Sequence, residues 1–243
     1  MTRIVALGDS ISFGVGEATE AEFKGAWSGR LATAIGSAQH VRYAWPGACV
    51  ADLGNAQLKA TLMSAPDIAL VSIGGNDAIR RGFDCTSFAE QLRAALEALR
   101  AAVPSIVLVN LPDISRTCAM PKKMRPHLHN RVEQLNCALS AAAAGTGVLL
   151  LDRWSDPDVY LPSHLAPDRV HPSSQGYQAL AHRTAELLNR PIHDSGDEQW
   201  LPEPGQAWWI ATKGVPWVIK RSMLLVPGAI SLMRTSSASR FSN

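Results

Sequence analysis

Five short apolar runs alternate with longer segments of helical periodicity over the first 190 residues, and this alternation constrains the fold more than any other feature. The apolar runs lie at Ile4–Leu7, Val41–Ala44, Ile68–Ile73, Ile106–Val109 and Val148–Leu151. They are continuous rather than alternately polar, which is typical of parallel strands buried on both faces. Strands that alternate with helices form βαβ units with right-handed crossovers. We therefore predict an α/β fold in which helices cover both faces of a doubly wound, five-stranded parallel sheet.

The clearest of the intervening helices is predicted over Ser87–Val103, where apolar residues recur at intervals of three and four. Ser87 followed by Glu90 has the spacing of a capping box, and Pro104 ends the periodic segment. Similar periodicity predicts four further helices, at Trp27–Ile35, Val50–Leu62, Leu128–Ala144 and Ser174–Leu188.

The composition changes near residue 190, which divides the chain into a domain over residues 1–190 and an extension over 191–243. The extension is rich in tryptophan, and no acidic residue follows Glu203. Its apolar stretches are interrupted by basic residues and Pro227, so it lacks the roughly 20 apolar residues of a transmembrane helix. We leave four alternatives open for it: a lid, an arm packed on the domain, a homodimer interface, or peripheral membrane contact through residues 200–240.

Charge and cysteine spacing exclude several classes of protein. A net charge of +2 over 243 residues gives no field suited to nucleic acid. The four cysteines lie far apart, so we expect neither a zinc site nor a disulfide framework, and we expect reduced thiols that fill the core. The N-terminus lacks the pattern of a signal peptide, which favours a cytoplasmic protein.

Polar motifs follow four of the five predicted strands. Gly8-Asp9-Ser10-Ile11 follows the first strand, Gly47 lies just after the second, Gly74-Gly75-Asn76-Asp77 follows the third, and Asp168-Arg169-Val170-His171 comes after the fifth. Ligands of doubly wound sheets bind at the carboxyl ends of the strands, so these motifs are expected to converge.

The motifs contain the groups that acyl transfer requires. A serine hydroxyl is a weak nucleophile and needs a base, for which we predict Ser10 and His171. Asp168 can accept a hydrogen bond from the other ring nitrogen and so set the imidazole tautomer. The backbone N–H groups of Ser10 and Gly47 and the side-chain amide of Asn76 are candidates for an oxyanion hole. Glycine at 47 would let the backbone approach the substrate closely.

In these four motifs the sequence resembles the SGNH/GDSL hydrolase family, with Ile11 in place of the leucine of the strict first motif. The resemblance covers about residues 3–189. It implies a flavodoxin-like three-layer fold and an esterase that uses a serine nucleophile with neither metal nor cofactor. The expected partner is a small-molecule acyl ester. Asp9, Gly75 and Asp77 then have supporting roles as members of the matched motifs.

Other interpretations of the same residues remain open. Ser10 alone would more often cap a helix, Asp9 can order the turn through its side chain, and Asn76-Asp77 can end a strand as an Asx-type turn. If water is excluded and an alcohol is bound, the same site would make an acyltransferase. A non-catalytic binding or membrane-surface module is the second alternative.

Two features outside the motifs are less specific. The basic segment Arg116–Arg131 either lines the substrate cleft or is a solvated loop that runs into an exposed helix face. The six histidines other than His171 lack an acidic residue three positions earlier in the manner of Asp168, and we interpret them as structural or exposed.

Overall fold

A computed structural model describes residues 2–17, 26–36 and 39–193 of the chain. The predicted extension over 191–243 therefore lies outside the described residues from position 194 onward. The division into two parts and the interfacial or membrane role of residues 200–240 stay predictions. Among the described residues, no helix has the length and apolar character needed to cross a membrane.

The centre of the molecule is a parallel sheet of five strands, as predicted. They are β1 (Arg3–Gly8), β2 (Gln39–Arg42), β3 (Ile68–Ser72), β4 (Ser105–Val109) and β5 (Leu149–Leu151). Their order is β2-β1-β3-β4-β5, the flavodoxin-like order, and every pairing is parallel. In this order the chain reverses direction across the sheet between β1 and β3, which is where ligands bind in such folds.

The second strand lies two residues earlier than predicted, at Gln39–Arg42 instead of Val41–Ala44. It pairs with β1 from Arg3↔Gln39 to Ala6↔Arg42. Since β2 is an edge strand and only half-buried, polar side chains are tolerated in it and an apolar run does not define its bounds.

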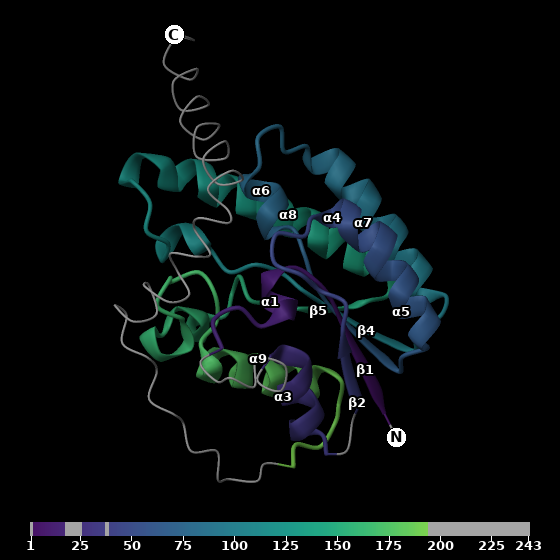
Figure 1. Ribbon diagram of the computed structural model, residues 1–243. Coiled ribbons are helices and arrows are strands. Elements are labelled where there is room, and N and C mark those ends of the chain that lie inside the picture. Colours follow the sequence, from purple (N-terminus) through teal and green to yellow (C-terminus); the bar gives the residue numbers. More distant parts are fainter. Residues whose placement is uncertain (1, 18–25, 37–38, 194–243) are drawn as a thin grey trace.

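Helices cover both faces of the sheet (Figure 1). One face is covered by α3 (Trp27–Ala34) and α9 (Ser174–Leu187). The other face is covered by α4 (Val50–Asp52), α5 (Leu58–Ser64), α7 (Cys85–Arg100) and α8 (Arg125–Thr146). Two short helices, α1 (Ser10–Phe13) and α6 (Gly75–Ile79), follow β1 and β3 directly.

The start of α7 corrects the predicted capping box. The N-cap is Asp84, whose carboxylate accepts hydrogen bonds from the N–H groups of Thr86 (2.9 Å) and Ser87 (3.2 Å). Ser87 therefore lies inside the first turn, where its hydroxyl accepts a hydrogen bond from Gln91 at 3.0 Å. Asp84 is the cap because its carboxylate accepts from the N–H groups at the start of the helix, and the helix therefore begins before Ser87.

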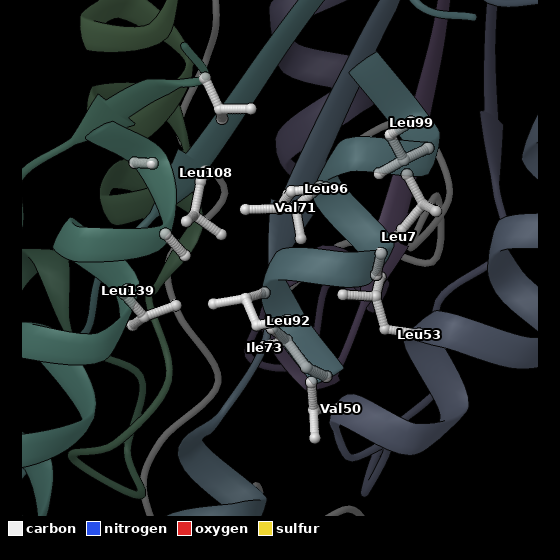
Figure 2. Packing of buried hydrophobic residues seen from close by; sticks show 14 of the residues in the cluster. Leu7, Val50, Leu53, Val71, Ile73, Leu92, Leu96, Leu99, Leu108 and Leu139 are labelled. Carbon is white, nitrogen blue, oxygen red and sulfur yellow. The ribbon is translucent and has the colours of Figure 1, made fainter. Parts of the chain in front are cut away.

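Alternate residues of the strands supply the two halves of the core. Val5 and Leu7 of β1 pack toward α7 and α8, and Ile4 and Ala6 pack toward α3 and α9. Figure 2 shows the first cluster, in which leucines of α7 meet Val71 of β3. The continuous apolar runs of β1, β3 and β4 are thus strands buried on both faces, as the sequence predicted, whereas the edge strands β2 and β5 are only partly buried.

The expectation that all four cysteines fill the core is wrong in part. All four are free, and Cys49 is buried, but Cys85 and Cys118 are half-buried and Cys137 is exposed. Cys137 lies on the outer face of α8, where helical periodicity and not residue type decides exposure.

Replacing Gly8 with alanine is expected to lower the free energy of unfolding by about 3–5 kcal/mol, measured by urea denaturation. Gly8 has φ +115°, and a Cβ there would lie 1.8 Å from the carbonyl oxygen of Ser72 on the neighbouring strand. Gly54 is the control, since a Cβ there has no neighbour within 4 Å. Gly54→Ala should not destabilise the protein, and equal unfolding midpoints for the two variants would contradict the prediction.

Candidate active site

The turn after β1 presents Ser10 at the edge of the sheet. Asp9 is the N-cap of α1, and its carboxylate accepts a hydrogen bond from the Ile11 N–H at 3.0 Å. Ser10 is therefore the first residue of a helix, where the backbone N–H has no partner within the helix. The residue that caps this helix is Asp9 and not Ser10. Ser10 is instead part of the cavity lining.

Ser10, His171 and Asp168 form a connected chain of side chains. The His171 Nε2 lies 2.9 Å from the Ser10 Oγ, and the His171 Nδ1 lies 2.5 Å from the Asp168 Oδ2. Ser10 and His171 are only 7% and 3% exposed, so both are shielded from bulk water. The structure thus brings together three residues that the sequence separates by up to 161 positions.

The loop that carries His171 is held by its own aspartate. The second carboxylate oxygen of Asp168 accepts hydrogen bonds from the N–H groups of Val170 (2.9 Å) and His171 (3.0 Å). Burial alone would raise the pKa of Asp168, but the charge of His171 and these hydrogen bonds hold the pKa below its ordinary value. Asp168 therefore stays ionised beside the imidazole.

The helix after β3 organises the loop after β2. The Asn76 amide donates to the carbonyl oxygen of Ala48 at 3.0 Å, and the Asp77 carboxylate accepts from the Val50 N–H at 3.2 Å. Burial raises the pKa of Asp77 above its ordinary value. An amide nitrogen carries two N–H groups, so the bond to Ala48 orients Asn76 and leaves one N–H for a ligand.

Gly47 lies in the loop that Asn76 and Asp77 hold. Its φ is +88°, a conformation that favours glycine, and its carbonyl oxygen accepts a hydrogen bond from Arg80 at 3.3 Å. Gly47 is not among the residues that line the cavity at Ser10, unlike Gly75 and Asn76. Gly47 is close to Asn76 because Asn76 binds the carbonyl oxygen of the next residue, Ala48. A role for the Gly47 N–H in an oxyanion hole stays a prediction.

Asp9 is buried in the turn that carries Ser10. Its Oδ1 also accepts a hydrogen bond from the Ser72 hydroxyl at 3.3 Å. Burial raises the pKa of Asp9 to about 6, although the hydrogen bond from Ile11 and the charge of His171 lower it. These contacts agree with the interpretation that Asp9 orders the turn through its side chain.

Sequence reasoning missed Gln57, which supports the end of β1. Its side-chain oxygen accepts from the Gly8 N–H (2.6 Å) and its side-chain nitrogen donates to the Gly8 carbonyl (2.9 Å). The predicted helix over Val50–Leu62 is in fact interrupted by a π-helical segment, Leu53–Gln57. Gln57 lies four residues after the buried Leu53, and a polar residue on an apolar helix stripe is the signal that could have revealed it.

Ser10, His171 and Asn76 line the same cavity. Its walls come from the loops after β1, β3, β4 and β5 and from the loop that precedes α9. Most of its lining is apolar, including Leu111, Ile114 and Val159. Among residues 2–17, 26–36 and 39–193, no group of three or more His, Cys, Asp or Glu side chains is arranged to hold a metal ion.

The basic segment Arg116–Arg131 does not supply any of the residues that line this cavity. Arg116 stacks on the ring of Tyr160 at 4.0 Å, and Arg131 donates to the carbonyl oxygen of Ala78 at 3.0 Å. His129 has an acidic partner after all, since its Nδ1 lies 2.8 Å from the Asp113 Oδ2. That partner lies 16 positions away in the sequence, a separation that a search for Asp-x-x-His spacing does not cover.

Comparison with known proteins identifies a family and a fold. The model of the GDSL-like lipase/acylhydrolase family matches residues 6–179. No curated protein matches the sequence. The solved structures that resemble the chain include a member of the lipolytic protein G-D-S-L family from Veillonella parvula (20% identity, 78% of this chain and 100% of that chain, TM-score 0.63). They also include an acetylxylan esterase from Geobacillus stearothermophilus (20%, 77% and 94%, 0.60) and an α/β hydrolase enzyme from the metagenome of Lake Arreo (22%, 77% and 95%, 0.60). At these identities the structural likeness establishes the fold alone.

Proposed function

Since the chain belongs to the GDSL-like lipase/acylhydrolase family, we propose that it hydrolyses carboxylic esters, with Ser10 as nucleophile, His171 as general base and Asp168 as the residue that orients His171. The observation that carries this proposal is the pair of short contacts from His171 to Ser10 (2.9 Å) and to Asp168 (2.5 Å). Nucleophile, base and orienting carboxylate within hydrogen-bond reach are the arrangement that activates a serine.

In the first half of the reaction, the Ser10 Oγ attacks the ester carbonyl carbon while its proton moves to the His171 Nε2. The carbonyl oxygen becomes an oxyanion, and the Asp168 carboxylate stabilises the imidazolium that forms. Collapse of the tetrahedral intermediate breaks the bond to the alcohol oxygen, which takes the proton from His171. The products of this half are the free alcohol and an acyl group bound to Ser10.

In the second half, water attacks the acyl-enzyme and gives one proton to His171. A second tetrahedral intermediate collapses, the Ser10 oxygen leaves and regains the proton, and the carboxylic acid is released. The oxyanion of both steps needs preorganised donors. We assign these to the Ser10 N–H, the free N–H of the Asn76 amide and the Gly47 N–H.

Three further residues act through the site's geometry. Asp9 caps the turn that presents Ser10, Asp77 holds the loop of Gly47 through the Val50 N–H, and Gly75 forms part of the cavity wall. We propose these as positioning residues, because their contacts are with the backbone and the cavity wall and not with the reacting atoms.

The proposal is tested by the hydrolysis of 4-nitrophenyl butyrate and by labelling with a fluorophosphonate that phosphonylates activated serines. We expect nitrophenolate release, and a phosphonyl adduct located on Ser10 by peptide mass spectrometry. A fully folded protein that neither hydrolyses the ester nor takes up the label would support the non-catalytic alternative. The acyltransferase alternative is tested in the same assay with added alcohols, where ester product in excess of free acid would favour it.

Replacing Asn76 with alanine is expected to lower kcat by roughly 10²–10³-fold with a small change in KM, because one oxyanion donor is lost. Steady-state kinetics with 4-nitrophenyl butyrate provides the measurement. Asn55 is the control, since it is exposed on the π-helical segment Leu53–Gln57 and its amide donates to the carbonyl oxygen of Ala51 at 2.7 Å. Asn55→Ala should keep the wild-type kcat, and an Asn76→Ala enzyme within about threefold of wild type would contradict the assignment.

A further inference from the structure

Arg153 is a buried cation in the wall of the active-site cavity. It lies two residues after β5 and is only 7% exposed. Its backbone is held in place because the Asn110 side-chain oxygen accepts hydrogen bonds from the N–H groups of Arg153 (2.5 Å) and Trp154 (3.2 Å). A guanidinium in such a place is costly to bury unless it has a partner.

The guanidinium of Arg153 is only partly satisfied by the protein. Its Nε lies 3.5 Å from the Asp156 Oδ2, which pairs the charges without meeting the geometry of a hydrogen bond. Within the described part of the chain, its Nε and Nη1 are buried without a hydrogen-bond partner. Asp156 also pairs with Arg183, which lies 3.0 Å away, is 37% exposed and has a second carboxylate partner in Asp158 at 3.0 Å. Arg153 therefore keeps donor capacity that no described residue uses.

The cation stays charged in this position. Burial lowers the pKa of Arg153 to about 10, and the charge of Asp156 opposes that shift. At neutral pH the guanidinium is still protonated. His164, another residue that lines the cavity, has an Nδ1 that is also buried without a hydrogen-bond partner among the described residues.

The cavity joins Arg153 to the nucleophile through an apolar stretch. Leu111, Ile114 and Val159 line the cavity together with Ser10 and Arg153. In the sheet β5 lies three strands from β1, which is about 14 Å at the usual strand spacing of about 4.8 Å. A substrate that reaches both ends needs an apolar spacer several carbons long between its ester and any group that meets Arg153.

We propose that the substrate is an anionic ester, whose carboxylate binds Arg153 across an apolar spacer from the scissile carbonyl. This inference rests on the proposed function and adds the substrate class. Asp156 balances the charge of Arg153, but two of its donors lack acceptors, and a carboxylate is the anion whose two oxygens match a guanidinium. The carboxylate belongs to the acyl part or to the alcohol part of the ester, and the two sources are distinguished by experiment.

The test compares charged esters with neutral counterparts of matched shape. For the acyl part, 4-nitrophenyl monoesters of succinic, glutaric and adipic acid are compared with their methyl 4-nitrophenyl diesters. For the alcohol part, 4-acetoxybenzoate is compared with its methyl ester. The rate with Ser10→Ala is subtracted throughout, because a carboxylate can attack its own activated ester without the enzyme. The readout is the ratio of kcat/KM for the charged ester to that for the neutral ester.

We expect at least one charged ester to be preferred roughly 10- to 100-fold, as expected for a charged hydrogen bond in a buried site. Arg153→Met keeps the apolar stem and should abolish the preference while hydrolysis of the neutral ester persists. Arg153→Lys retains the charge and should keep part of the preference. Arg183→Met is the matched control, because Arg183 is the other cation that pairs with Asp156 but does not line the cavity. The ratio of kcat/KM for charged and neutral esters should be the same in this variant as in the wild type.

The outcomes separate this inference from the function on which it rests. The ratio is independent of the folded fraction, so a destabilised Arg153→Met sample still reports on specificity. Ser10-dependent hydrolysis with no charge preference in any pair, or a preference that Arg153→Met leaves unchanged, would overturn the anionic substrate and leave the esterase intact. Lack of Ser10-dependent hydrolysis of all the esters would overturn both.

Discussion

Ser10→Ala is expected to lower kcat for 4-nitrophenyl butyrate by about 10⁵–10⁶-fold, to the level supported by the oxyanion hole and binding alone. The reason is that His171 would have no hydroxyl to deprotonate, since its Nε2 faces the Ser10 Oγ at 2.9 Å. KM should change little, because the cavity walls keep their shape. Stopped-flow measurements should also show that the acyl-enzyme burst is lost.

The control for this variant lies in the same short helix. Ser12 is fully buried, and its hydroxyl has no hydrogen-bond partner among the described residues. Ser12→Ala removes the same atom two positions away and should keep wild-type kcat and labelling. If Ser10→Ala retained more than about one hundredth of the wild-type kcat, the nucleophile would have to be a different group.

Asp168→Asn is expected to lower kcat by about 10⁴-fold while the protein stays folded. An asparagine can keep accepting from the N–H groups of Val170 and His171, so the loop survives. It cannot supply the negative charge that holds the imidazole tautomer and stabilises the imidazolium. The measurement is kcat with 4-nitrophenyl butyrate, compared with that of the wild type at the same pH.

Asp113 provides a control with the same chemistry in another place. Its carboxylate contacts the His129 Nδ1 at 2.8 Å and caps the Ser115 N–H at 3.1 Å, and neither it nor His129 lines the cavity. Asp113→Asn should leave kcat within a few-fold of wild type. Equal losses in the two variants would mean that any Asp–His pair of this domain matters only for stability.

Much of the fold could be predicted from the sequence because the three inner strands, β1, β3 and β4, are buried on both faces. Such strands are continuous apolar runs, and that pattern predicts them. The apolar pattern misplaces β2 because an edge strand does not need apolar residues. The capping-box pattern misplaces the start of α7 because Asp84, three residues before Ser87, caps the helix one turn earlier. The interruption of the helix over Val50–Leu62 was missed because a π-helical segment has no distinctive residue pattern.

The sequence by itself determined the parallel α/β sheet and that its polar motifs meet at one edge, because the carboxyl ends of parallel strands converge. It also determined the pairing of Asp168 with His171, because a spacing of three residues lets the carboxylate reach both the backbone N–H and the ring of His171. Only the tertiary structure decided which backbone groups Gln57 and Asn76 bind, and that Arg153 is among the residues that line the cavity. These contacts join loops that are far apart in the chain, and they depend on strand order and side-chain direction. No local pattern encodes them, since a buried arginine and an exposed one are written with the same letter.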